Sequence, residues 1–104
     1  MASAAKGMTS DYLWDGPEDG PLLVLAPGSG GSMRHPWMTE VATALAETGL
    51  RIARFDFPYM RQGRKAPDRE PVLLQTWLDV IEELRPDAIG GKSMGGRIAS
   101  MLAD

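Results

Sequence analysis

The chain has 104 residues, no cysteine, one histidine and a formal net charge of −3. This length suits one small domain, and the lack of cysteine excludes a disulfide framework and thiolate metal sites. Apolar residues make up 43% of the chain, which excludes a disordered protein. The acidic balance gives no reason to expect nucleic acid or an anionic membrane as a partner. We expect neither a signal peptide nor a membrane span, and hence a cytoplasmic protein.

Residues 1–21 are polar and rich in turn residues, and we expect a short edge strand at 9–14. The apolar run LLVLA at 22–26 then predicts a strand buried on both faces, as in a parallel sheet. It ends in PGSGGS at 27–32, a loop that leaves many backbone N–H groups free.

A helix is predicted next. Pro36 suits its first turn and Gly49 its end, and its apolar residues recur at helical spacing: Met38, Val41, Ala42 and Leu45. The segment LRIARFDF at 50–57 predicts a second strand, in which Arg51 and Arg54 indicate incomplete burial or a position near a sheet edge. Residues 58–70 are expected to form a long loop that carries a local basic cluster.

Pro71 opens a second predicted helix, which Pro86 ends and whose expected buried stripe is Leu74, Trp77, Leu78, Ile81 and Leu84. A third strand at 87–91 leads into a third helix with a buried face of Ile98, Met101 and Leu102. The alternation predicts an α/β fold with three αβα layers and a parallel sheet. Ligands of such sheets bind beyond the carboxyl ends of the strands.

The glycine motifs at those strand ends admit three interpretations. A phosphate-binding loop ending in Gly91-Lys92-Ser93 needs glycine where the chain has Pro86, so this spacing fails. A dinucleotide loop at 28–33, with Asp56 as the ribose-binding acid, has Met33 where the third glycine belongs. A nucleotide-binding α/β domain therefore stays the weaker alternative.

The third interpretation is a nucleophile elbow, because Gly91-Lys92-Ser93-Met94-Gly95 matches G-x-S-x-G between a predicted strand and a predicted helix. The sharp turn brings strand and helix together, so the residues two before and two after the serine must be small. Gly91 and Gly95 meet this need, and Ser93 is the expected nucleophile.

An acyl-transfer site also needs N–H donors for the oxyanion. The Met94 N–H, at the start of the third helix, is one candidate. The second donor is expected from the 27–32 loop, with the Ser29 N–H as the best candidate and the Gly30 N–H next. This interpretation explains both glycine clusters with one mechanism.

Four further residues are expected near this face: His35, Asp56, Arg61 and Lys92. We expect His35 to line the pocket or hold the loop rather than act as a base. Asp56 is expected to accept backbone N–H bonds from neighbouring loops, with orientation of a catalytic base as the alternative. Arg61 and Lys92 are most simply solvated, with recognition of an anionic substrate by the basic cluster as the alternative. No metal-ligand spacing is present, and no cofactor is expected.

Three segments together resemble an α/β-hydrolase-fold family of small, lidless proteins: LAPGSGGSMRHPWM, RFDFPYMRQGRKAPDR and GGKSMGGRIASMLAD. Bacterial members are described as predicted hydrolases of dienelactone-hydrolase type. Animal relatives include testis-expressed proteins and subunits of the NSL chromatin complex. The resemblance covers residues 22–104 and implies a serine, an acid and a histidine in that chain order, with Ser93 as nucleophile and the 28–30 loop as oxyanion loop.

The family's acid and histidine follow later strands, and the 104 residues contain no counterpart. We therefore expect residues 1–104 to be the N-terminal part of a single α/β-hydrolase domain, with edge strand and turns at 1–21 and the core with its elbow at 22–104. Such a piece is expected to be inactive alone. Its third strand would leave an open edge, so we also expect self-association.

For the complete protein, the sequence predicts a serine hydrolase that acts on a small-molecule ester, thioester or related acyl bond. A non-catalytic interaction module with the same fold is the alternative, because a fold does not fix a function.

Overall fold

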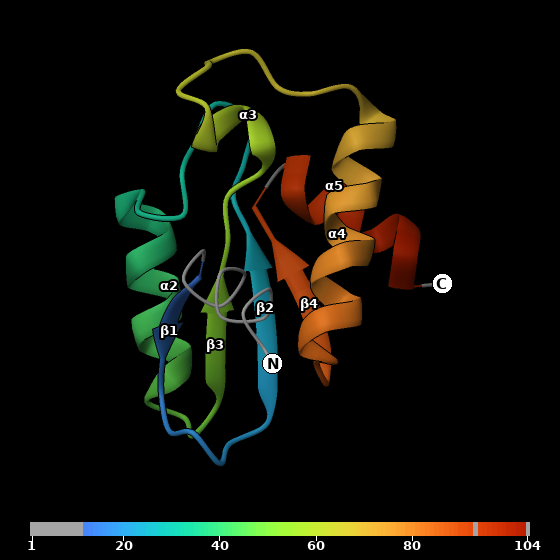
Figure 1. The fold of residues 1–104 in the computed structure, drawn as a ribbon. Helices are drawn as coiled ribbons and strands as arrows, with labels where there is room; N and C mark the ends of the chain where they lie inside the picture. The colour runs from blue at the N-terminus through green and yellow to red at the C-terminus, as the bar shows by residue number, and fades with distance from the viewer. Residues whose placement is uncertain (1–11, 93, 104) are drawn as a thin grey trace, which may run out of the picture.

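The computed structural model describes residues 12–92 and 94–103. Its centre is a four-stranded sheet with the order β1-β3-β2-β4 (Figure 1). The strands are β1 (Leu13–Asp15), β2 (Leu22–Ala26), β3 (Arg51–Arg54) and β4 (Ala88–Gly91). β3, β2 and β4 run parallel, whereas β1 pairs antiparallel with β3. The predicted α/β architecture is therefore confirmed, with one antiparallel edge strand added to the parallel sheet.

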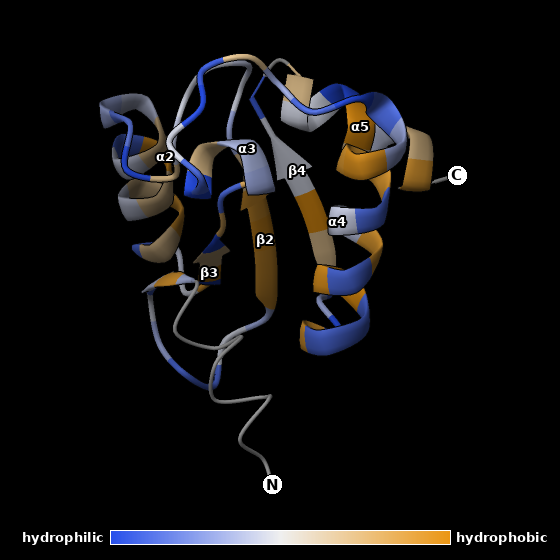
Figure 2. Ribbon diagram, turned by 45° about the horizontal axis from the view of Figure 1, so that its top comes forward, coloured by the Kyte–Doolittle hydropathy of each residue, from blue (hydrophilic) through white to orange (hydrophobic). Residues whose placement is uncertain are grey.

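Helices cover both faces of this sheet. They are α2 (Pro36–Ala46), α4 (Glu70–Leu84) and α5 (Met94–Ala103), while the short helix α3 (Pro58–Arg61) lies beyond the carboxyl ends of the strands (Figure 1). On one face, Met38 of α2 packs with Leu25 and Ile52. On the other face, Trp77 of α4 and Ile98 of α5 belong to a larger apolar core. Figure 2 shows hydrophobic colour along β2, at the centre of the fold, and hydrophilic colour on the outer side of α4.

The strand at 50–57 is shorter than predicted, because only Arg51–Arg54 pair with neighbouring strands. The expectation that its arginines mark incomplete burial is wrong for Arg54, which is only 6% exposed. Its guanidinium Nε lies 3.1 Å from Asp15 Oδ2, and Nη1 donates to the Met33 carbonyl (2.9 Å) and to Thr39 Oγ1 (3.0 Å). A buried cation is tolerated here because it is paired and hydrogen-bonded.

Three other expectations are corrected. The predicted long loop at 58–70 begins with the short helix α3, which buries Tyr59. The buried face of α4 consists of Leu73, Thr76, Trp77 and Val80, whereas Leu78 is 47% exposed. In α5, Ala99 is buried and Met101 is 45% exposed. The other expected members are confirmed, since Trp77 and Ile98 are buried and the partly buried Leu74, Ile81, Leu84 and Leu102 pack against the same core. The sheet and the neighbouring helix widen each buried face by about one residue and leave Leu78 and Met101 outside it.

β4 is an edge strand of the described sheet, since β2 is the one strand that pairs with it there. The N-terminal strand begins at Leu13, and residues 9–11 of the expected strand lie outside the described residues. Within the described part of the chain, no helix combines the length and apolarity needed to cross a membrane.

Candidate active site

The turn between β4 and α5 holds the predicted nucleophile elbow. β4 ends at Gly91 and α5 begins at Met94, so a strand passes into a helix within two residues, as the motif requires. Ser93, the predicted nucleophile, lies outside the described residues. The geometry of the site is therefore built from the residues on either side of it.

Glycines close this turn against the neighbouring backbone. A Cβ on Gly95 would lie 2.4 Å from the Pro27 carbonyl oxygen, and one on Gly91 would lie 2.8 Å from the Ala26 oxygen. A Cβ on Gly96 would lie 2.5 Å from the Gly91 oxygen. Each of these approaches is closer than a side chain allows. The prediction that this turn requires residues without a side chain at Gly91 and Gly95 is therefore confirmed.

The same contacts bring the elbow beside the 27–32 loop. β2 and β4 are neighbours with Ala26 opposite Gly91, and the Lys92 N–H extends this ladder by donating to the Ala26 carbonyl at 3.1 Å. The 27–32 loop begins directly after Ala26, the last residue of β2. Two glycine segments more than 60 positions apart in the sequence thus meet at the carboxyl edge of the parallel sheet.

The 27–32 loop is held by the segment that follows β3. Met33 N–H donates to Asp56 Oδ1 at 2.7 Å, while the Met33 carbonyl accepts from Arg54. Further along the loop, Gly30 N–H donates to the hydroxyl of the buried Tyr59 at 3.0 Å. The Gly30 N–H is thus engaged, whereas the Ser29 N–H has no partner among the described residues. Of the two loop donors expected from the sequence, Ser29 is the one left available.

Asp56 accepts a backbone N–H bond, as predicted, and lies half-buried at the end of β3. Burial raises the pKa of its carboxyl above the ordinary value of 3.8. The Met33 N–H bond and the positive charges of Arg61 and Arg34 offset part of this rise in pKa. Arg61 also donates from Nε to the Asp56 carbonyl at 3.1 Å, so its guanidinium packs along the β3–α3 connection.

His35 is the N-cap of α2. Its Nδ1 accepts the Trp37 N–H at 3.1 Å, which satisfies one of the free donors at the start of the helix. A neutral imidazole that accepts at Nδ1 carries its proton on Nε2. In this tautomer His35 is a hydrogen-bond donor toward its surroundings and cannot accept a proton from a serine.

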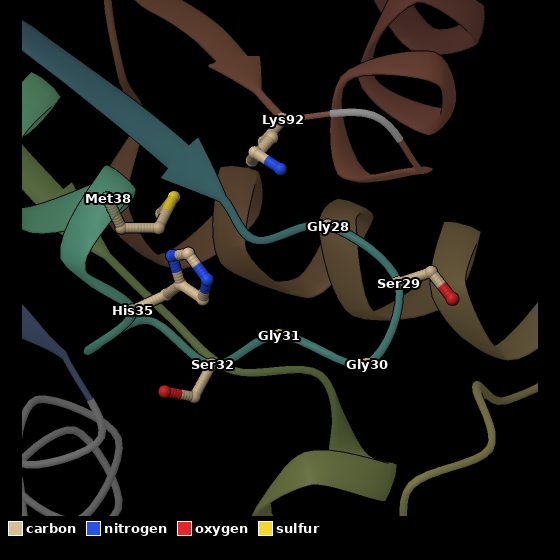
Figure 3. A pocket seen from close by; sticks show the side chains of 8 residues that line it. All are labelled: Gly28, Ser29, Gly30, Gly31, Ser32, His35, Met38 and Lys92. Atoms are coloured by element: carbon tan, nitrogen blue, oxygen red, sulfur yellow. The ribbon is translucent and has the colours of Figure 1, made fainter.

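A cavity of about 210 Å³ lies inside the curve of the loop, and Figure 3 shows its lining. The lining residues are Gly28, Ser29, Gly30, Gly31, Ser32, His35, Met38 and Lys92. His35 and Lys92 thus belong to one pocket, as expected, whereas Asp56 and Arg61 do not line it. The Ser29 and Ser32 hydroxyls point away from the loop interior, which leaves backbone groups facing the cavity (Figure 3).

Two residues of this site were not recognised in the sequence. Tyr59 holds the loop at Gly30, and Trp77 donates its indole N–H to the Gly95 carbonyl at 3.3 Å, where it steadies the first turn of α5. Trp77 was predicted to pack, which it does against Phe55. Its polar contact had no local signal, because the partner lies on another helix.

The geometry argues against the nucleotide alternative. α2 begins at Pro36, several residues beyond Gly28-Ser29-Gly30, so the loop does not run straight into a helix N-terminus as a dinucleotide loop does. Met33 is buried where the third glycine belongs. Among residues 12–92 and 94–103, no group of His, Asp and Glu side chains is arranged to hold a metal ion.

Comparison with known proteins agrees with this architecture. Residues 19–104 match the family described as alpha/beta hydrolase domain. Searches of curated proteins and of solved structures each found no match. The matched range spans the sheet from β2 onward, the 27–32 loop and the elbow. The chain therefore belongs to the α/β-hydrolase family.

Proposed function

We propose that this chain carries the nucleophile and oxyanion loop of a serine hydrolase that cleaves an ester, thioester or related acyl bond of a small molecule. The observation that carries the proposal is the lack of space for a Cβ at Gly91 and Gly95 against the end of β2. That packing sets Gly91 and Gly95, which flank Ser93 in the sequence, against the end of β2 and the start of the glycine loop, and such closeness is what an elbow and an oxyanion loop need.

In the proposed reaction, Ser93 Oγ forms a bond to the acyl carbon and gives its proton to a general base. The alcohol or thiol then leaves with that proton, and water cleaves the acyl-serine to release the acid. The Ser29 and Met94 N–H groups would stabilise the oxyanion. Each is without a backbone partner among the described residues, which is the state expected of an oxyanion donor.

In this proposal the base and the acid come from outside the 104 residues. His35 is the one histidine of the sequence, and its Nδ1 is used in capping α2. A serine hydroxyl without a base is a poor nucleophile at neutral pH. The chain by itself is therefore proposed to be inactive toward esters.

The test is labelling with a fluorophosphonate probe, with added imidazole as an external base and peptide mass spectrometry to locate the label. We expect slow labelling at Ser93 that imidazole accelerates, and no label in Ser93→Ala. Equal labelling of both proteins would remove Ser93 as the nucleophile.

A non-catalytic interaction module is the second candidate, and the capping role of His35 favours it, because it leaves the chain without a base of its own. This candidate predicts that folded protein stays unlabelled at Ser93 even with imidazole.

The proposal also includes a closer relationship to lidless hydrolases of dienelactone-hydrolase type, and to testis-expressed proteins and NSL-complex subunits. It includes a cytoplasmic location as well.

A further inference from the structure

The cavity inside the glycine loop has an uneven distribution of charge. Lys92 is its one charged lining residue, and no carboxylate lines it among the described residues. The glycines contribute backbone without side chains, and Met38 adds an apolar wall. A cavity with this lining is electrically positive.

Lys92 is fixed without being neutralised. Its backbone N–H is bonded to Ala26, and its Nζ lies 5.7 Å from the centroid of the Trp37 ring. Cation–π contacts of this kind hold an ammonium in place while leaving its N–H donors available. No Asp or Glu in the described part of the chain forms an ion pair with Lys92. The buried Arg54, by contrast, is paired with Asp15.

His35 supplies a second donor to the same cavity. Because its Nδ1 accepts the Trp37 N–H, its proton is on Nε2, and Figure 3 shows the ring lying within the curve of the loop. Trp37 thus organises both groups, with its backbone N–H orienting the imidazole and its indole ring lying beside the ammonium. Trp37 thereby positions two hydrogen-bond donors, His35 and Lys92, at the same cavity.

We infer that the cavity binds an anionic group of the substrate, a carboxylate or a phosphate, through Lys92 Nζ and His35 Nε2. The inference rests on the proposed function, because Lys92 directly precedes Ser93 in the sequence and its cavity is also lined by Ser29, whose N–H is the proposed oxyanion donor of the loop. The cavity volume of about 210 Å³ gives room for a short anionic arm.

The test measures binding, not turnover. Glutarate, inorganic phosphate and the neutral glutaramide are titrated into the full chain, and backbone amide shifts at 28–31 are followed by NMR. We expect an anion to bind and glutaramide not to bind. If glutarate binds more tightly than phosphate, the substrate group is a carboxylate. If phosphate binds more tightly, the substrate group is a phosphate. Equal binding of glutarate and glutaramide would overturn the inference.

Two variants and a matched control locate the site. Lys92→Gln should weaken anion binding about tenfold or more, as expected for loss of a charged hydrogen bond. Arg85→Gln removes a positive charge from an exposed residue between α4 and the start of β4, outside the cavity lining, and should change binding less than about twofold. His35→Asn keeps a good helix cap but lacks the Nε2 donor, and should weaken binding about threefold. Unchanged affinity in Lys92→Gln would contradict the site.

Ser93→Ala separates this inference from the proposed function. It should bind the anion as the unmodified chain does. Anion binding that depends on Lys92, together with no labelling of Ser93, would leave the anion site standing and remove the hydrolase. Labelling at Ser93 together with charge-independent binding would remove the anion site and leave the hydrolase.

Discussion

Gly91 and Gly90 are neighbours in β4 that meet different surroundings. A Cβ on Gly91 would approach the Ala26 oxygen to 2.8 Å and the Gly95 and Gly96 backbone to 2.9 Å. A Cβ on Gly90 would meet only the Leu25 side chain, at an ordinary 3.6 Å. Identical residues one position apart thus have different roles, and only one of them is required by the elbow.

Gly91→Ala should therefore lower the free energy of unfolding by about 2 kcal/mol, because the new methyl group has to displace backbone. Gly90→Ala is the matched control and should stay within about 0.5 kcal/mol, because it fits and restricts the unfolded chain. Urea unfolding of the three proteins measures both values. A Gly91→Ala protein as stable as Gly90→Ala would contradict the tight elbow.

Asp56 should make stability depend on pH. Its pKa in the folded protein is raised above 3.8, mainly by burial. When a carboxyl has a higher pKa in the folded than in the unfolded protein, its contribution to the free energy of unfolding is greatest below the pKa of the unfolded state. This contribution is lost as the pH rises through the pKa of the folded state. In Asp56→Asn the amide oxygen can still accept the Met33 N–H bond, and the uncharged side chain does not lose stability as the pH rises.

We therefore expect the stability of Asp56→Asn relative to the unmodified chain to increase as pH rises from about 3.8. Urea unfolding of both proteins at a series of pH values measures this difference. A difference that stays constant with pH, or that falls, would contradict the effect of burial.

At the scale of elements, the segment following β3 shapes the loop following β2. Asp56 and Arg54 hold Met33 from both sides, and Tyr59 holds Gly30. Because of these contacts the Gly30 N–H is engaged, while the Ser29 N–H has no partner among the described residues. The sequence could place a strand before the loop and a helix after it, because both have strong local signals. It could not show which donor is engaged, because Tyr59 lies 29 positions from Gly30.

Tyr59→Phe should free the Gly30 N–H while leaving the apolar contacts of the ring in place. We expect faster amide hydrogen exchange at Gly30, by about tenfold, which matches the loss of about 1.4 kcal/mol from one hydrogen bond. The Met33 amide, held by Asp56, serves as the internal control and should exchange at its original rate. Equal acceleration at both amides would indicate general loosening instead of loss of one contact.

For the molecule as a whole, the main physical consequence of this architecture is the edge of β4, which pairs on one side alone among residues 12–92 and 94–103. The groove beside it is lined by Ile81, Pro86, Asp87, Ala88 and Ile89, and an unpaired strand edge invites pairing with another strand. The self-association expected from the sequence stays a prediction. Size-exclusion chromatography with light scattering should show a mass that rises with protein concentration.

Ala88→Lys provides the matched test of this edge, because Ala88 is exposed on β4 and a lysine there opposes strand pairing. We expect this variant to remain monomeric at concentrations where the unmodified chain associates. A monomeric unmodified chain at all concentrations would contradict the prediction, and equal association of both proteins would place the contact elsewhere.

The sequence by itself determined the strand at 22–26, the start of α2 at Pro36 and the glycine requirement of the elbow. These follow from short-range sterics and from apolar periodicity, which neighbouring residues carry. Only the tertiary structure decided which side of α4 is buried, with Leu73 inside and Leu78 outside. It also decided that Arg54 is buried and that Trp37 joins His35 to Lys92. Those outcomes depend on sheet order and on contacts between distant segments, which no local pattern specifies.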